Sequence, residues 1–221
     1  MSDWGIGLLK NVPVIPVEWN EKQRTGYEEI DFSDIEFYDE NILAEIDSCL
    51  QGEFEGTDYR KIEMSYKERA FLNGIIRKAK PKSVVEMGVS AGGSTTVILN
   101  AIRDIEGAKL YSFDYSTVWY RDLNVGQNHG RNTGFLVYQT VPRLLSKWEL
   151  YTGGVPCRYF DALPSDGIDI SFMDTVHANP GEHLNILEIL PFMKKNGIVI
   201  YHDTAFHTLF PYAVHLYGLA L

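Results

Sequence analysis

Short apolar runs alternate with segments of helical periodicity from about residue 65 onward, and this alternation constrains the fold most. Each run has the length of a buried strand, and helical spacing of apolar residues or a turn signal separates one run from the next. The predicted strands are residues 83–87 (SVVEM), 109–113 (KLYSF), 155–160 (VPCRYF), 169–174 (DISFMD) and 197–201 (GIVIY). Strands that alternate with helices predict an α/β protein with a mainly parallel sheet.

Four helices are expected beside these strands, at residues 65–79, 94–104, 141–149 and 183–195. In the first of them Phe71 and Ile75 belong to a set of apolar residues at helical spacing, and Pro81 then ends the helix. Residues 1–60 are acidic and aromatic, with one short helix expected at 42–50, and we interpret them as an N-terminal arm. We interpret residues 61–221 as one domain.

Composition narrows the function classes. The chain has 20 Lys and Arg against 30 Asp and Glu, so its net charge of −10 disfavours a nucleic-acid partner. No apolar run reaches the length of a membrane span, and the first residues do not resemble a secretory signal. With only Cys49 and Cys157, neither a disulfide framework nor a CxxC zinc site is expected. We therefore expect a cytoplasmic protein without a membrane partner.

The first candidate site is the glycine-rich segment VVEMGVSAGGSTT, which follows a predicted buried strand and leads into a helix. Gly88 and Gly92 allow a sharp bend and the close approach of a ligand to the new helix's amides. The dinucleotide pattern GxGxxG and the triphosphate pattern GxxxxGK[ST] are both absent. Glu86 would repel a pyrophosphate but suits a cationic amine. A loop that merely connects two elements is the alternative.

The second candidate is Asp114, which ends the next predicted strand, 28 residues after Glu86. An acid at this position of a doubly wound sheet can accept both ribose hydroxyls of an adenosine-containing ligand. The alternative is a solvated aspartate in a turn. The glycine-rich segment nearby favours the ribose role.

The third candidate is a set of acids and histidines at the carboxyl ends of two predicted strands: Asp174, His177, His202 and Asp203. Three interpretations remain open. The set can hold a divalent cation that orients and activates a hydroxyl, a histidine can act as a metal-free general base, or the histidines are hydrogen-bonded residues of the rim. The candidate catalytic residues are Asp174, His177 and His202.

These motifs together resemble the class I S-adenosylmethionine-dependent methyltransferases, over about residues 64–204. The pattern E-x-G-x-x-x-G-x-S-T, the later acid Asp114, and the segments DISFMDxxH and GIVIYHDT carry the resemblance. Within that class the chain is similar to small-molecule O-methyltransferases of the catechol and macrocin types and to cephalosporin-hydroxylase-like proteins. The resemblance implies a Rossmann-like doubly wound sheet with helices on both faces.

The resemblance also implies a role for each site residue. Glu86 and Gly88 would lie near the methionine part of S-adenosylmethionine, and Ser94 would open the helix beneath it. Asp114 would hold the ribose, and Asp161 and Ala162 would border the adenine. The metal ligands would be Asp174, His202 and Asp203. The family pair at the last two positions is acid-acid or acid-amide, so the histidine favours Mn, Fe or Zn over Mg.

The expected activity is O-methylation of a small polar metabolite, such as a sugar or a natural-product intermediate. An N-methyltransferase is the alternative, as is a cofactor-binding protein of the same fold with a different reaction or a partner-dependent role. The long segment 115–134 exceeds usual loop lengths and is expected to cover or line the acceptor site, or to be a mobile loop with scattered aromatics. Its candidate residues are Trp119, Tyr120, Arg121, His129 and Arg131.

The last 17 residues after Thr204 are very apolar and too short for the two further strands of the family sheet. The sheet is therefore expected to lack those strands within this sequence. Large apolar side chains in water forfeit about 1.5–3 kcal/mol each. We expect residues beyond Leu221 or a second copy of the chain to cover this segment, which favours a homo-oligomer.

Overall fold

The computed structural model describes residues 64, 66–122, 130–175 and 181–202. Several expectations fall outside these residues. They are the N-terminal arm with its helix at 42–50, the apolar segment 205–221, and the side chains of His129, His177 and Asp203.

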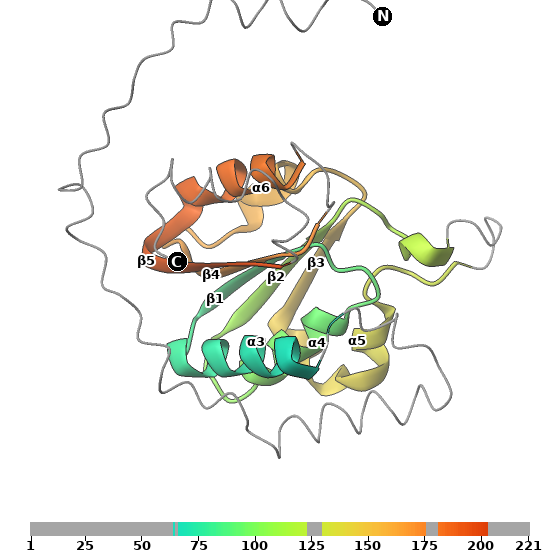
Figure 1. Ribbon diagram of the computed structural model, residues 1–221, viewed down its shortest axis with the longest axis horizontal. Helices are drawn as coiled ribbons and strands as arrows, with labels where there is room; N and C mark the ends of the chain where they lie inside the picture. The colour runs from blue at the N-terminus through green and yellow to red at the C-terminus, as the bar shows by residue number, and fades with distance from the viewer. Residues whose placement is uncertain (1–63, 65, 123–129, 176–180, 203–221) are drawn as a thin grey trace, which may run out of the picture.

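Five parallel strands form one sheet in the order β3-β2-β1-β4-β5 (Figure 1). The strands are β1 (Ser83–Met87), β2 (Lys109–Asp114), β3 (Trp148–Thr152), β4 (Ile168–Met173) and β5 (Met193–Tyr201). The central strand β1 pairs with β2 on one side and β4 on the other, so Val85 lies opposite both Tyr111 and Ser171. The strands β2 and β3 lie on one side of β1, and the later strands β4 and β5 lie on the other side. In open α/β sheets, ligands bind in the crevice at the point where the strand order reverses in this way.

Helices cover both faces of the sheet (Figure 1). One face carries α3 (Tyr66–Ala79), α4 (Gly93–Ala101) and α5 (Phe135–Thr140), and the other carries α6 (Gly181–Ile189) and the 3-10 helix η5 (Pro156–Ala162). Shorter 3-10 turns are η3 (Tyr120–Asp122), η4 (Pro142–Lys147) and η6 (Leu190–Phe192). The predicted Rossmann-like doubly wound fold is confirmed. In the described parts of the chain, no helix is long and apolar enough to cross a membrane.

The alternation of side chains along β1 divides the core into two layers. Val84 packs with α3 and α4, whereas Val85 and Met87 pack with residues of η5 and α6. Glu86 shares the face of Val84, because successive side chains of a strand point to opposite faces. A carboxyl group is thereby placed inside the layer between the sheet and α4.

Two predicted elements between β2 and β4 are wrong. The expected helix at 141–149 is the 3-10 helix η4 followed by β3, and the expected strand at 155–160 is the 3-10 helix η5. Pro156 explains the second difference, because it occupies the first position of η5, where no N–H is needed, and a proline in a strand cannot donate to the ladder. The first difference arises because Trp148 begins the edge strand β3.

Candidate functional site

The turn after β1 has three residues with positive φ: Gly88 at +90°, Ser90 at +52° and Gly92 at +101°. This left-handed region favours glycine, because a Cβ crowds the backbone there. A Cβ on Gly88 would lie only 1.8 Å from the backbone oxygen of Asp174. Glycine is therefore required at position 88 by the end of β4, in addition to the sharp bend and the approach of a ligand that the sequence indicates. The two strands that flank the crevice touch at this point.

Asp114, at the end of β2, clamps this turn. One carboxylate oxygen accepts the backbone N–H groups of Val89 and Ser90, both at 2.9 Å, and the other accepts that of Ser116 at 2.8 Å. Three of about four acceptor sites of the carboxylate are thus used within the protein. The remaining capacity is compatible with the predicted ribose contact, which stays a prediction.

Glu86 is fully buried and surrounded by hydroxyl groups. Its Oε1 accepts a hydrogen bond from Ser94 at 2.6 Å, and its Oε2 accepts from Thr95 at 2.7 Å and Ser112 at 2.6 Å. The Ser112 oxygen in turn accepts the indole N–H of Trp148 at 2.9 Å. Burial raises the pKa of Glu86 from 4.5 to about 7, and the three hydroxyl donors offset only part of that rise.

These hydrogen bonds give Glu86 a structural role. Because Ser94 and Thr95 lie in the first turn of α4, their bonds to Glu86 fix the start of that helix against β1. The expected contact of Glu86 with the methionine part of a cofactor stays a prediction. The observed role is to hold the helix start that follows the glycine-rich turn.

Trp119, expected in the wall of an acceptor pocket, is an anchor for the loop after β2. It is only 4% exposed, and its indole N–H donates to the Oγ of Ser90 at 3.0 Å. The guanidinium of Arg131 lies over the indole ring at 4.4 Å and forms two bonds to Asp122, each at 2.8 Å. Tyr120 is 47% exposed on the surface. Trp119 and Arg131 therefore hold the loop on the glycine-rich turn.

The strand that was expected to lead to Asp161 and Ala162 does not exist, so their assignment to the adenine loses its original reason. The carboxyl end of β3 is Thr152, and residues 153–155 (GGV) follow it at the edge where ligands bind in such sheets. Val155 is 50% exposed there. Sequence reasoning missed this segment, although the paired glycines after WELYT are a strand-end signal.

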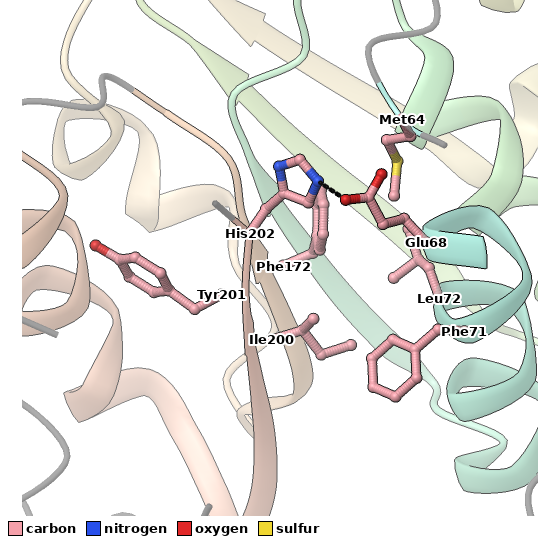
Figure 2. A pocket seen from close by; sticks show the side chains of 8 residues that line it. All are labelled: Met64, Glu68, Phe71, Leu72, Phe172, Ile200, Tyr201 and His202. Carbon is pink, nitrogen blue, oxygen red and sulfur yellow. Dashed lines mark ion pairs between the residues drawn. The ribbon is translucent and has the colours of Figure 1, made fainter. Parts of the chain in front are cut away.

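Asp174 and His202, at the ends of β4 and β5, come together. The Nδ1 of His202 lies 3.4 Å from Asp174 Oδ1. Its Nε2 lies 3.4 Å from Oε1 of Glu68 on α3, and Figure 2 shows this second contact. The His202 side chain is 11% exposed. Glu68 was not among the predicted site residues, since only a contact between α3 and β5 brings it here.

A cavity of about 310 Å³ opens beside this group, between α3 and the strands β4 and β5 (Figure 2). Glu68 and His202 form its polar end. Apart from Tyr201, its other lining residues are apolar: Met64, Phe71, Leu72, Phe172 and Ile200.

The structure describes two of the three predicted metal ligands, Asp174 and His202. The third, Asp203, lies outside the described residues. Among the residues that the structure describes, no group of three or more His, Cys, Asp and Glu side chains could hold a metal ion. A divalent cation at this site therefore stays a prediction.

A sequence model of a family described as a methyltransferase domain matches residues 85–204, more than half of the chain. The chain belongs to this methyltransferase family. The match extends from β1 to just beyond β5 and includes the glycine-rich turn, Asp114, Asp174 and His202. Glu68 lies outside the matched residues. The predicted recognition of a class I methyltransferase is confirmed.

Solved structures share the fold of this methyltransferase. A cofactor-bound protein from MTB matches with a TM-score of 0.53 and 13% identity, over 82% of this chain and 77% of its own. The O-methyltransferase from Bacillus cereus in complex with SAH matches with a TM-score of 0.50 and 14% identity, over 76% of this chain and 69% of its own. The O-methyltransferase TomG from Streptomyces achromogenes is in complex with SAM and is involved in tomaymycin synthesis. It matches with a TM-score of 0.50 and 15% identity, over 83% of this chain and 74% of its own. No curated protein sequence matches the chain.

Proposed function

We propose that this methyltransferase transfers the methyl group of S-adenosylmethionine to a hydroxyl oxygen of a small molecule. A continuous line of contacts along the carboxyl edge of the sheet carries the proposal. Asp114 binds the turn after β1, the turn abuts the backbone of Asp174 at Gly88, and Asp174 faces His202. The first part of this line suits an adenosine-containing cofactor and the last part a hydroxylated acceptor. Methyl transfer needs the two held side by side.

The residues at the cofactor end fit S-adenosylmethionine. Asp114 keeps acceptor capacity for ribose hydroxyls, and the turn from Gly88 to Gly92 leads into the first turn of α4. Residues 153–155 are the candidates for the adenine border, in place of Asp161 and Ala162. Two solved structures that share the fold are complexes with SAH and with SAM, which supports this choice of cofactor. S-adenosylmethionine supplies a methyl group on a sulfonium sulfur.

His202 is the candidate base at the acceptor end. An imidazole can accept a hydroxyl proton near neutral pH. Asp174 and Glu68 face its two nitrogens, and their negative charges favour the charged ring that results. Both ring nitrogens are buried, so an acceptor hydroxyl has to take the place of Glu68 at Nε2 before His202 can accept its proton, while Asp174 at Nδ1 orients the ring. A divalent cation held by Asp174, His202 and Asp203 is the alternative way to activate the same oxygen.

Calorimetry and a methyl-transfer assay together test the proposal. We expect S-adenosylmethionine to bind, and Asp114→Ala to weaken that binding about tenfold or more, since hydrogen bonds to a charged group are worth roughly 1.5–3 kcal/mol. His202→Asn should lower kcat for hydroxylated acceptors while the cofactor affinity stays unchanged. Absence of cofactor binding by the folded protein would contradict the proposal.

Two further experiments distinguish a histidine base from a metal ion, and an oxygen acceptor from a nitrogen acceptor. If His202 acts as the base, activity should persist in EDTA, whereas loss in EDTA and recovery with Mn²⁺ or Mg²⁺ would assign the site to a metal. A panel of amines run beside the hydroxylated acceptors tests the nitrogen alternative. Methyl transfer to amines alone would replace O-methylation with N-methylation.

A further inference from the structure

The cavity beside His202 has one polar end and an apolar body. Phe71 and Leu72 of α3 face Phe172 of β4 and Ile200 of β5 across it (Figure 2). Its volume of about 310 Å³ is at the lower limit of ordinary ligand pockets, which span about 300–1,000 Å³. The space therefore suits a molecule, or the part of a molecule, that is about the size of a single ring.

The polar end of the cavity has acidic side chains. Glu68 lines the cavity and faces one nitrogen of His202, and Asp174 faces the other nitrogen. Among the lining residues that the structure describes, none is a lysine or an arginine. An acceptor with a carboxylate or phosphate next to its hydroxyl would meet the carboxylate of Glu68, with that of Asp174 on the other side of the imidazole. The arrangement selects against anions by repulsion.

The apolar walls select against a sugar, which is one of the acceptors suggested by the sequence. A sugar carries hydroxyl groups around its whole ring, and those facing Phe71, Leu72 and Ile200 would lose water without gaining a partner. Leaving a buried polar group unsatisfied is costly. A ring or short chain with polar groups at one end avoids this loss.

We infer that this cavity binds the acceptor, and that the acceptor is a small, partly apolar hydroxyl compound that is neutral or positively charged next to its hydroxyl. The inference rests on the proposed function for the chemistry that follows binding. The apolar part of the acceptor lies against α3 and β5, and the hydroxyl lies at His202. Glu68 is then a specificity-determining residue that sits outside the family match.

Three phenols of similar size, whose side chains are positively charged, neutral and negatively charged, provide the probes: 2-(2-aminoethyl)phenol, 2-propylphenol and (2-hydroxyphenyl)acetate. Their binding to the protein with S-adenosylhomocysteine is measured by calorimetry, with glucose as the sugar probe. The amine and the neutral phenol should bind more tightly than the carboxylate, and glucose should not compete. Ile200→Phe, which fills the apolar part of the cavity, should weaken all three phenols.

Glu68→Gln tests the charge argument without changing the shape of the side chain. Since Glu68 is 45% exposed, removing its charge should reduce the preference for amine over carboxylate by about two- to fivefold. Glu106→Gln is the control, because it removes the same charge from an exposed residue between α4 and β2. The control should leave the preference unchanged.

The outcomes separate this inference from the proposed function. Equal binding of amine and carboxylate, a preference unaffected by Glu68→Gln, or displacement of the phenols by glucose would overturn the inference. Methyl transfer to some hydroxyl compound without phenol binding would overturn the inference and leave the proposed function intact. Charge-selective phenol binding without methyl transfer to any hydroxyl compound would do the reverse.

Discussion

The buried carboxyl of Glu86 links the stability of the protein to pH. Its pKa rises from 4.5 to about 7 on folding, because burial disfavours the charged form more than the hydroxyls of Ser94, Thr95 and Ser112 favour it. The folded protein therefore binds this proton more tightly than the unfolded chain. The resulting stabilisation is fully present below about pH 4.5 and is lost as the pH rises through about 7.

The size of the effect follows from the two pKa values. At about 1.4 kcal/mol per pH unit, the proton on Glu86 contributes about 3 kcal/mol over the whole window. Integrated between pH 5.5 and 8.0, the same two values give a loss of about 2 kcal/mol. Glu86→Gln cannot ionise, so the stability of this variant lacks that part of the pH dependence.

Urea denaturation of the wild type and of Glu86→Gln between pH 5.5 and 8.0 measures the effect. The free energy of unfolding of the wild type minus that of the variant should fall by about 2 kcal/mol across this range. Glu106→Gln, at an exposed position, controls for the change in net charge. A difference that is independent of pH, or that grows as the pH rises, would refute the reasoning, because the hydroxyl groups would then hold the carboxylate ionised.

Three substitutions test the parts of the cofactor turn. Gly88→Ala, whose Cβ would lie 1.8 Å from the oxygen of Asp174, should cost about 3 kcal/mol or more in urea denaturation, and near-wild-type stability would contradict that contact. Asp114→Asn replaces an acceptor oxygen by a donor, so calorimetry should give about tenfold weaker S-adenosylmethionine binding, and unchanged affinity would remove Asp114 from the site. Trp119→Phe keeps an aromatic side chain but loses the bond to Ser90 and part of the buried ring, so stability should fall by about 1 kcal/mol or more and cofactor affinity several-fold. Unchanged affinity would make the anchor purely structural.

The central strands could be predicted because each one is buried on both faces. β1, β2 and β4 read as short apolar runs, and the glycines and acids that follow them mark their carboxyl ends. β3 was missed because it lies at the edge of the sheet, where only Trp148 is buried, so its residues do not form a continuous apolar run. Pro156 then started a 3-10 helix in a segment whose composition resembles a strand.

The sequence predicts where the site residues lie in the fold better than it predicts which residues they contact. The sequence indicates that Asp114 and Asp174 end neighbouring parts of one sheet edge, because parallel strands end at the same edge. It does not indicate that the carboxylate of Asp114 accepts hydrogen bonds from the backbone of Val89, Ser90 and Ser116. The contact between Glu68 and His202 joins residues far apart in the chain, and only the packing of α3 against the end of β5 creates it.

The close approach of Gly88 to Asp174 bears on how the two ligands influence each other. The backbone N–H of Asp174 donates to Met87 at 2.9 Å, and its oxygen leaves no room for a side chain on Gly88. A ligand that shifted the turn would therefore also shift the residue that faces His202. Occupancy of one half of the site would then change the affinity of the other, and such coupling is reciprocal by necessity. In that case an acceptor affinity measured without cofactor would differ from the affinity that operates during turnover, and the order in which products leave would depend on the same shared backbone.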